Sequence, residues 1–450
     1  MLAREMARPE SYAPPMSFSG FPEDVQLTIL SFLRPPEIAA FACTSRHSAF
    51  LCGQARLWFA MCDRRWGAKT VVQSWAPGRS AGPPFSRLYR VLSQWENLIG
   101  FWRRLGRGGA GAPSLVFFEW GASSITGSVV SPSPEAGSYG VLKVPFLWLS
   151  LSPRGEPVGF LHPARRFDSN GYLEQLVSGS GNLDLDLIPV TIAFMGEDRF
   201  VVEEDKSFYA DVRGGGGDLG SSDAPKSAGE TSPAERHMLE MYQYFANGLI
   251  PIGDEPFIRK QRWKWERDGF GRKRWQAEQF MRIADCYPTP SRPLQGLWKG
   301  IGENMRLAFY LVTYDNMGGV ACRRVGDASE PFSSYSPVFW TSSTEFLRRP
   351  FSIEEENIYD SREHIGPITS HGTGIERAVC RVLCINSSYD LVIPDSSGSY
   401  TNSQNVEGRI WVYDTGTFGF GFLRNDYIVD LQNIVRNGCL LDNVDFDSSF

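Results

Sequence analysis

Apolar positions between residues 18 and 66 recur at the three- and four-residue spacing that is typical of helices. In the first predicted helix they form two stripes, which are Val25, Ile29, Phe32 and Leu33 on one side and Leu27 and Leu30 on the other. A helix with two apolar stripes must bury both, and a segment of about 50 residues is too small to cover both by itself. We therefore expect one stripe to hold the helices together and the other to contact a partner protein. Packing of both stripes on the rest of the chain is the alternative.

Prolines and capping residues set the limits of these short helices. Pro22 suits the first position of a helix, because its fixed φ fits there and its missing N–H is not needed. The pair Pro35-Pro36 ends this helix and starts the next one. Thr44 or Ser45 can cap a third helix, and Leu57-Trp58-Phe59 adds an apolar patch beyond it. The segment 18–67 is thus predicted to be a small helical module, preceded by a disordered tail over residues 1–17.

Residues 68–105 are predicted to connect this module to the rest of the chain. A loop rich in Pro and Gly comes first, and an amphipathic helix follows. The apolar residues of this helix share one broad face, and they are Leu88, Val91, Leu92, Trp95, Leu98, Ile99 and Trp102. We expect the helix to brace the module against the domain that follows.

From residue 106 the pattern changes to that of β-strands. Short runs rich in β-branched and aromatic residues are separated by clusters of Gly, Pro, Ser and Asn, and the same pattern returns after Pro293. The region 206–292 between these blocks is predicted to be an insertion that is partly disordered, because residues 213–232 have low complexity. We expect the two β-rich blocks to form one sheet system, which is a closed or nearly closed antiparallel barrel within a domain over 106–450.

The clearest hairpin covers residues 408–424, with a turn near Gly416. After the turn, aromatic residues alternate with glycines, so that Phe418, Phe420 and Phe422 face one way while Gly419 and Gly421 face the other. Glycine in a strand indicates either a bend of the sheet or a groove in which another backbone lies close. We favour the bend, because a barrel wall needs such positions.

One segment carries a possible second function. Residues 258–275 interleave basic residues with Trp263, Trp265 and Trp275, which is a pattern that single-stranded nucleic acid can bind. A solvated helix face with packed tryptophans is the interpretation that we favour, because the chain as a whole is acidic, and a nuclear-import signal around residues 272–274 is a further alternative.

Composition narrows the function classes. The 450 residues carry a net charge of −6, which disfavours nucleic acid as a general partner. Eight scattered cysteines without a CxxC pair indicate reduced thiols rather than disulfides, a zinc-bound RING or another metal site. The sequence contains no apolar run of membrane-spanning length and no phosphate loop or nucleophile elbow. We expect a cytoplasmic and/or nuclear protein that is not an enzyme and needs no cofactor.

The helical module resembles an F-box. The residues that carry the resemblance are Phe21-Pro22-Glu23-Asp24-Val25, Ile29-Leu30-Ser31-Phe32-Leu33, Pro36-Glu37-Ile38, Ser45-Arg46, Leu57-Trp58 and Trp66-Gly67. Phe21 replaces the usual leucine, and His47-Ser48 replaces the usual aromatic residue after Ser-Arg. The resemblance implies docking on a Skp1-type adaptor and, through it, on a cullin. The predicted Skp1-binding residues are Pro22, Val25, Ile29, Leu30, Leu33, Ile38 and Trp58.

The β-rich part resembles, less specifically, the substrate-binding β-barrel region of the F-box-only protein 31 type, which is described as cyclin D1-binding. The stretches PLQGLWKGIGENMRLAFYLVTYD and GRIWVYDTGTFGFGF carry this resemblance, and the long Gly-rich insertion is typical of a plant-type variant. Recognition of a cyclin is not implied, because the substrate pocket of that type has no matched positions here. The candidate substrate-binding residues are Trp298, Trp411, Phe418, Phe420 and Phe422.

Together these patterns predict an α+β protein with an N-terminal helical F-box, a connector helix and a large antiparallel β-barrel-like domain. We expect a non-catalytic adaptor that holds an unknown protein substrate for ubiquitination and degradation. The alternative is a lipocalin-like small-ligand module, or an RNA-binding module, coupled to the F-box.

Overall fold

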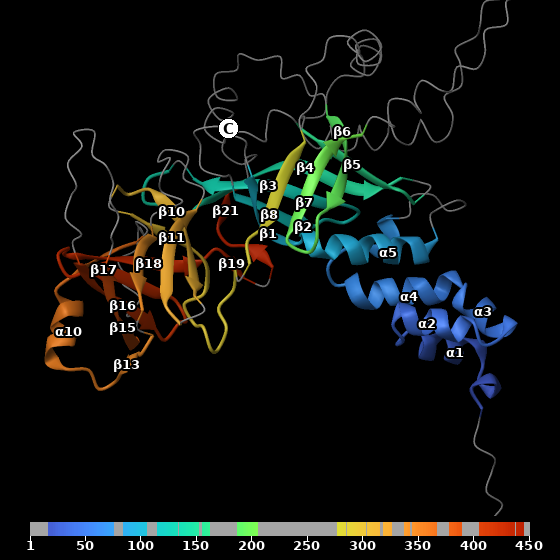
Figure 1. Cartoon of the computed structure of the whole chain (residues 1–450), viewed down its shortest axis with the longest axis horizontal. Coiled ribbons are helices and arrows are strands. Elements are labelled where there is room, and N and C mark those ends of the chain that lie inside the picture. Colours follow the sequence, from blue (N-terminus) through green and yellow to red (C-terminus); the bar gives the residue numbers. More distant parts are fainter. Residues whose placement is uncertain are drawn as a thin grey trace, which may run out of the picture. The chain divides into compact units, whose positions relative to one another are not determined.

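The computed structural model divides into two compact units (Figure 1). The helical unit comprises residues up to Glu96 with Gly121–Ser123 and Leu151–Glu156, and the β unit comprises the remainder. The structure describes residues 17–75, 84–105, 115–133, 135–152, 155–162, 187–205, 277–284, 286–302, 304–315, 318–325, 337–342, 344–366, 378–388, 405–436 and 438–444.

The helical unit is built from short helices, as the proline and capping pattern predicts. Its elements are η1 (Phe18–Gly20), α1 (Glu23–Leu30), α2 (Pro35–Ala42), α3 (Arg46–Cys52), α4 (Ala55–Trp66), η2 (Val72–Trp75) and α5 (Phe85–Trp95). Ser45 caps α3, because its Oγ accepts a hydrogen bond from the backbone N–H of Ser48 at 3.0 Å. The core of the unit contains Leu27, Leu30, Ile38, Leu51, Leu57, Met61 and Trp66.

The connector helix is shorter than predicted. The structure ends α5 at Trp95, adds the turn η3 (Glu96–Leu98) and then begins β1 at Gly100. Gly100 has φ +116°, which a helix does not allow and which L side chains rarely adopt. The predicted helical face that included Trp102 was therefore wrong beyond residue 95, because Phe101–Leu105 pair as a strand instead.

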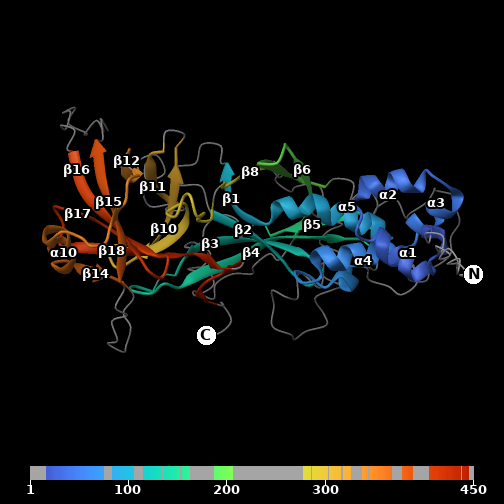
Figure 2. The ribbon, with the colours of Figure 1, turned by 90° about the horizontal axis from the view of Figure 1, so that it is seen from below.

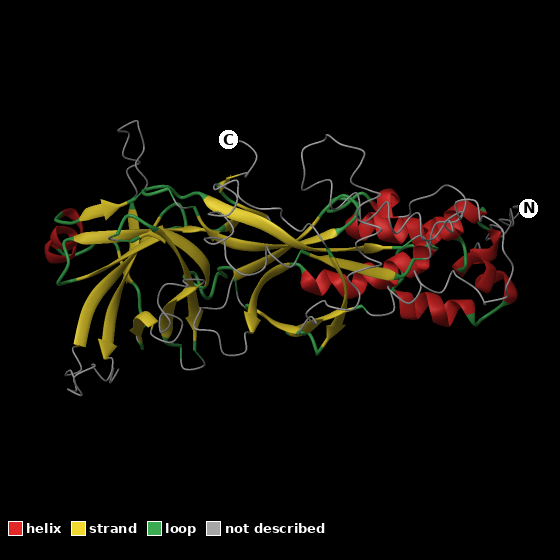
Figure 3. Ribbon diagram, turned by 90° about the horizontal axis from the view of Figure 1, so that it is seen from above, coloured by secondary structure: helices red, strands yellow, loops and turns green. Residues whose placement is uncertain are grey.

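The first sheet of the β unit is a closed barrel of eight strands in which each strand pairs with the next one along the chain (Figures 1 and 3). A final pairing of β8 with β1 completes the ring. The strands are β1 (Gly100–Leu105), β2 (Leu115–Trp120), β3 (Ile125–Pro132), β4 (Val141–Leu151), β5 (Pro157–Leu161), β6 (Ile188–Phe194), β7 (Arg199–Glu204) and β8 (Glu278–Arg282). The short β21 (Asn443–Val444) adds to β4 in parallel.

The closing strand β8 lies inside the predicted insertion 206–292, so that prediction extended too far at its C-terminal end. Phe280 and Met281 of β8 pair with residues of both β1 and β7. Residues 206–276 between β7 and β8, including the basic segment 258–275, lie outside the described residues.

The second sheet contains two four-stranded meanders, β9–β12 and β15–β18, which are joined by the pairing of β18 with β9 (Figure 2). The Thr341 hydroxyl of β12 also donates to the Cys384 carbonyl of β15 at 3.0 Å, which links the two ends of this row. Its elements are β9 (Gly296–Ile301), β10 (Leu307–Tyr314), β11 (Val320–Val325), β12 (Pro337–Thr341), β13 (Leu347–Arg348), β14 (Glu363–Ile365), β15 (Val379–Ser388), β16 (Asn405–Tyr413), β17 (Phe418–Phe422), β18 (Tyr427–Asn433) and the helix α10 (Ile353–Asp360); the strands β19 (Val435–Arg436) and β20 (Cys439–Leu440) form a separate pair.

The prediction of a single sheet system was therefore wrong. The strands β1 to β8 close on one another, and among the described later strands the short β21 alone pairs with this ring, while β9 to β18 form a second sheet. The prediction of a largely antiparallel β architecture with a barrel is confirmed, and so is the hairpin of β16 and β17 across Asp414–Gly416.

Each sheet has an apolar core. Aromatic rings fill the first barrel, where Trp102, Phe118 and Phe280 all contact Phe200. The second sheet encloses a cluster that includes Trp298, Tyr310, Phe339, Phe418 and Phe420. A further cluster joins the two sheets and contains Phe101, Phe117, Leu297, Ile301, Phe309 and Ile434.

A buried lysine also joins the two sheets. The Nζ of Lys299 on β9 is fully buried and donates to the carbonyls of Tyr139 and Leu441 and to the Asp442 carboxylate, at 2.9, 3.2 and 2.6 Å. Burial lowers the pKa of Lys299, and the Asp442 carboxylate opposes this effect. The residues just before β21 are thus held against the start of β4.

Candidate partner-binding surface

The helix α1 presents one apolar stripe to solvent and buries the other. Leu27 and Leu30 are 6% and 1% exposed, and they belong to the core of the helical unit. Val25, Ile29 and Phe32 are 40%, 41% and 71% exposed. Val25 and Ile29 are four positions apart, which puts them on one side of α1. Phe32 lies in the turn just after the helix, where its backbone N–H donates to the Ile29 carbonyl at 3.1 Å. The expectation that one stripe holds the helices together thus agrees with the structure, and contact of the other stripe with a partner protein stays a prediction.

The predicted Skp1-binding residues divide into three groups. Pro22, Val25 and Ile29 are exposed, and Leu33 and Trp58 are half-buried. Leu30 and Ile38 are 1% and 2% exposed, so their side chains support the surface from beneath and offer nothing to a docked protein. We define the α1 stripe as Val25, Ile29 and Phe32.

Two exposed aromatic residues were not among the predicted site residues. Phe32 had been placed in the same apolar stripe as Val25 and Ile29, and this shared position could have identified it as a candidate binding residue. Phe50 of α3 is 59% exposed, although nothing in the local spacing separates it from a core residue.

The ring of Phe32 is held in place although it is exposed. The guanidinium of Arg64 lies 4.6 Å from the ring centroid, and its Nη1 donates to the Ser31 hydroxyl at 3.1 Å. A cation over an aromatic face is attracted by the ring quadrupole. A ring ordered in this way loses little further conformational entropy when a partner covers it.

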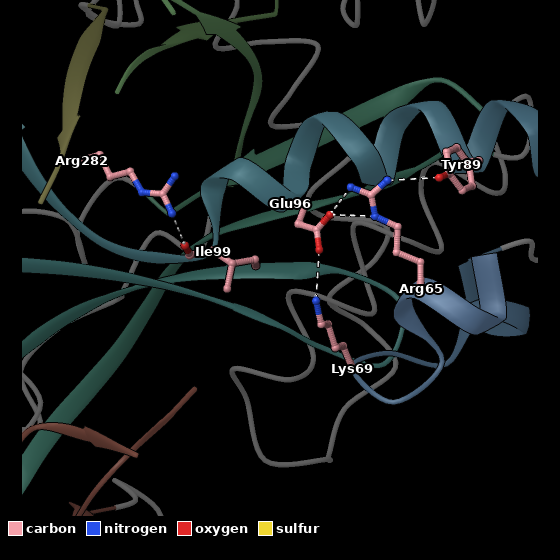
Figure 4. Close-up of polar contacts among 6 residues, drawn as sticks. All are labelled: Arg65, Lys69, Tyr89, Glu96, Ile99 and Arg282. Carbon is pink, nitrogen blue, oxygen red and sulfur yellow. Dashed lines mark hydrogen bonds and ion pairs between the residues drawn. The ribbon is translucent and has the colours of Figure 1, made fainter. Parts of the chain in front are cut away.

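Behind this surface, a charged cluster fastens α4 to the end of α5 (Figure 4). The Glu96 carboxylate accepts hydrogen bonds from Arg65 at 2.7 and 3.0 Å and from Lys69 at 3.0 Å, while Arg65 also donates to the Tyr89 hydroxyl at 3.1 Å. Burial by itself would raise the pKa of Glu96, but the bonds from Lys69 and Arg65 outweigh it, so that the pKa lies below its ordinary value. The cluster thus fixes the end of α4 against α5 and η3.

The predicted substrate-binding residues lie in the interior of the β unit. Trp298 and Trp411 are fully buried, and Phe418 and Phe420 are 1% and 4% exposed. Phe422 is half-buried and packs against the same core cluster as Phe418. The structure brings four of the five into one cluster, with Trp411 in a neighbouring one, but as packing residues. The buried four offer no surface to a docked protein.

The glycines opposite these phenylalanines make room for the chain's own side chains. A Cβ at Gly419 would lie 2.5 Å from the Tyr413 hydroxyl and 2.9 Å from the Asp430 carboxylate. A Cβ at Gly421 would lie 2.7 Å from the Tyr427 carbonyl oxygen and 3.2 Å from the Trp411 ring. The space beside these two glycines is therefore taken by the chain itself, which disfavours a groove for the backbone of a bound peptide.

The part of the chain that the structure describes contains neither a cluster of metal-ligating side chains nor a membrane-spanning helix. Within the described residues, no group of three or more His, Cys, Asp and Glu side chains is placed to hold a metal ion. No helix in the described ranges has the length and apolarity needed to cross a bilayer.

Known proteins that are similar in sequence to this chain identify the family of the helical unit. The F-box domain family matches residues 18–60, which run from η1 through the first half of α4. The chain is also 42% identical over 442 residues to the F-box protein At3g12350 of Arabidopsis thaliana, and this match covers 96% of the chain and 98% of the relative. The chain therefore belongs to the F-box protein family.

Proposed function

We propose that this protein is a non-catalytic substrate adaptor of a Skp1–cullin–F-box ubiquitin ligase. The observation that carries the proposal is the α1 stripe, which is apolar, ordered and exposed inside a segment that matches the F-box family. F-box domains generally bind Skp1, and Val25, Ile29 and Phe32 are the side chains that can supply apolar contact area to it.

The β unit is the part that we assign to substrate capture. Both of its sheets fill their interiors with their own aromatic side chains, so a lipocalin-like small ligand finds the central space of the first barrel occupied by Trp102, Phe118, Phe200 and Phe280. This packing favours recognition of a protein substrate on the outer surface or at the ends of the sheets. The RNA-binding alternative rests on residues 258–275, which lie outside the described part of the chain.

The mechanism in this proposal is proximity. An adaptor that binds Skp1 with one unit and a substrate with the other raises the local concentration of a substrate lysine near the loaded conjugating enzyme. Such a role asks for two binding surfaces and needs no catalytic side chain in this protein. Cytoplasm and nucleus are the compartments in which we propose that it acts.

A capture experiment with the full chain tests the first half of the proposal. Purified Skp1-type adaptor and cullin are offered to the wild-type protein, to a double variant Val25→Ser with Ile29→Ser, and to the matched control Val71→Ser with Ile353→Ser. The control also replaces exposed apolar residues, which are 52% and 77% exposed and lie outside α1. Capture by the wild type and the control but not by the α1 variant is expected. Equal capture by all three would refute the assignment of this surface.

A further inference from the structure

Three arginines lie toward one end of the second sheet, and within the described ranges none of them forms an ion pair with a carboxylate. Arg381 of β15 alternates with Leu383 and Ile385, which belong to the core of this sheet, so it shares their inward face. Its guanidinium lies 5.0 Å from the ring centroid of Phe346. Arg292 lies over the ring of Tyr314 at 5.9 Å.

The same two arginines act on one tyrosine. Burial raises the pKa of Tyr314, and the nearby charges of Arg381 and Arg292 both oppose this rise. The Tyr314 hydroxyl accepts a hydrogen bond from the backbone N–H of Leu294 at 3.4 Å. Tyr314 and Phe346 are half-buried and pack against the cluster that holds Trp298 and Phe418. Arg292 thus contacts Tyr314 and Arg381 contacts Phe346, and both rings pack against this one cluster.

A third arginine adds to the charge. Arg348 is the direct Cα partner of Arg381 where β13 pairs with β15. Like charges directly opposed across two strands are unfavourable. Within the described ranges, Arg292, Arg348 and Arg381 form no ion pair with an acidic side chain. The chain is acidic overall, so this end of the sheet is a local exception to its charge.

We propose that this end of the second sheet binds an acidic peptide segment of the substrate, with the side-chain carboxylates of the peptide on Arg381, Arg292 and Arg348. This inference rests on the proposed adaptor function and names the chemistry of what the β unit captures. Guanidinium groups hold carboxylates by paired, charge-assisted hydrogen bonds, and stacking on Phe346 and Tyr314 orients two of the guanidinium groups before a ligand arrives. A bound carboxylate would also relieve the repulsion between Arg348 and Arg381.

A fluorescein-labelled peptide of eight glutamates is the probe, and its anisotropy is measured with the full chain at low salt. We compare the wild type with Arg381→Gln and with the matched control Arg424→Gln. Arg424 lies over the ring of Phe422, toward the opposite end of the same sheet, because Phe422 pairs with Gly408 whereas Arg381 pairs with Val412. Both variants lose one positive charge, so a non-specific attraction weakens equally in both.

Binding by the wild type that weakens about tenfold in Arg381→Gln and changes little in Arg424→Gln is the expected result. Absence of binding by the wild type, or equal weakening in both variants, would overturn the proposal. Tighter binding of an eight-phosphate oligonucleotide at the same arginines would also overturn it, because the surface would then read phosphate rather than carboxylate. Capture of Skp1 is measured on the same samples. If the wild type binds the peptide but does not capture Skp1, the adaptor function is refuted and the binding of an acidic peptide is not.

Discussion

Ile29 and Leu30 are consecutive residues of α1, yet Leu30 is 1% exposed in the core of the helical unit and Ile29 is 41% exposed. These two neighbours show that one side of α1 packs in the core while the other side is exposed. Leu30 joins Leu27 in holding the helices together, whereas Ile29 joins Val25 and Phe32 on a surface that nothing in the described chain covers. Sequence patterns place both in one F-box motif, and only their burial assigns them to stability and to binding.

Replacement of Leu30 by Ala is expected to destabilise the helical unit. Removing a fully buried leucine from a packed core costs about 2–5 kcal/mol of unfolding free energy, because the transfer free energy is lost and a cavity remains. Ile29→Ala should change stability by less than about 1 kcal/mol, because its side chain is already half in water. Thermal and urea unfolding of the full chain, followed by circular dichroism at a helix band, measures both. Equal losses for the two variants would contradict the assigned burial.

Periodicity and local chemistry were enough to predict the short N-terminal helices and most of the strands, but not the partners of the strands. The prolines at 22, 35 and 36 and the cap Ser45 have local effects, and the helices begin where they indicate. The closure of the first barrel depends on β1 meeting β8 across a long stretch of chain, and no local signal specifies such a pairing. A strand that is apolar on both sides also gives no sign of which cluster its aromatic residues will join. For this reason Trp298 and Phe418 were assigned to a binding surface and lie in a core.

The glycine at 419 is expected to be essential for packing of the second sheet. In Gly419→Ala the new methyl group would meet the Tyr413 hydroxyl and the Ile428 side chain at 2.5 and 2.6 Å. Such overpacking costs about 1–3 kcal/mol, and it should also disturb the 2.7 Å hydrogen bond from Tyr413 to Asp430. Gly416→Ala is not a clean comparison because φ there is +80°, so Gly366→Ala, where a Cβ meets open space, is the control. Unfolding at the same denaturant concentration for both variants would contradict this packing.

Stability of the helical unit should fall in acid through Glu96. Because the folded-state pKa of Glu96 lies below its ordinary value of 4.5, the carboxylate stabilises the fold above that value. This contribution is lost as the pH falls below 4.5 and through the folded-state pKa, when the bonds from Arg65 and Lys69 lose their charged acceptor. The effect should amount to about 1 kcal/mol or less, because the side chain is partly exposed.

The variant Glu96→Gln isolates the contribution of the carboxylate charge to the free energy of unfolding. Unfolding free energies of the wild type and the variant are compared across the acid range, and their difference should shrink as the pH falls. A difference that stays constant with pH would show that the carboxylate charge contributes nothing.

Cysteine reactivity should separate the exposed thiols from the buried ones. Burial raises the pKa of Cys62 to about 12, and it also raises the pKa of Cys322. Cys43 and Cys439 are exposed. At about pH 8, iodoacetamide should therefore alkylate Cys43 and Cys439 of the native chain quickly and leave Cys62 and Cys322 unmodified, because only the thiolate reacts and access is required. Peptide mass spectrometry gives the site of each modification, and urea-unfolded protein, in which all eight cysteines should react, is the control. Rapid labelling of Cys62 in the native chain would contradict its burial.

Titration of purified Skp1-type adaptor into the full chain tests the central claim most directly, with the wild type compared with Ile29→Asp and with Phe32→Ala. The account predicts that each substitution weakens the affinity by about tenfold or more, because both side chains belong to the α1 stripe, while the melting temperature stays that of the wild type. Unchanged Skp1 affinity in both variants, with the fold intact, would contradict the claim that the α1 stripe is the docking surface.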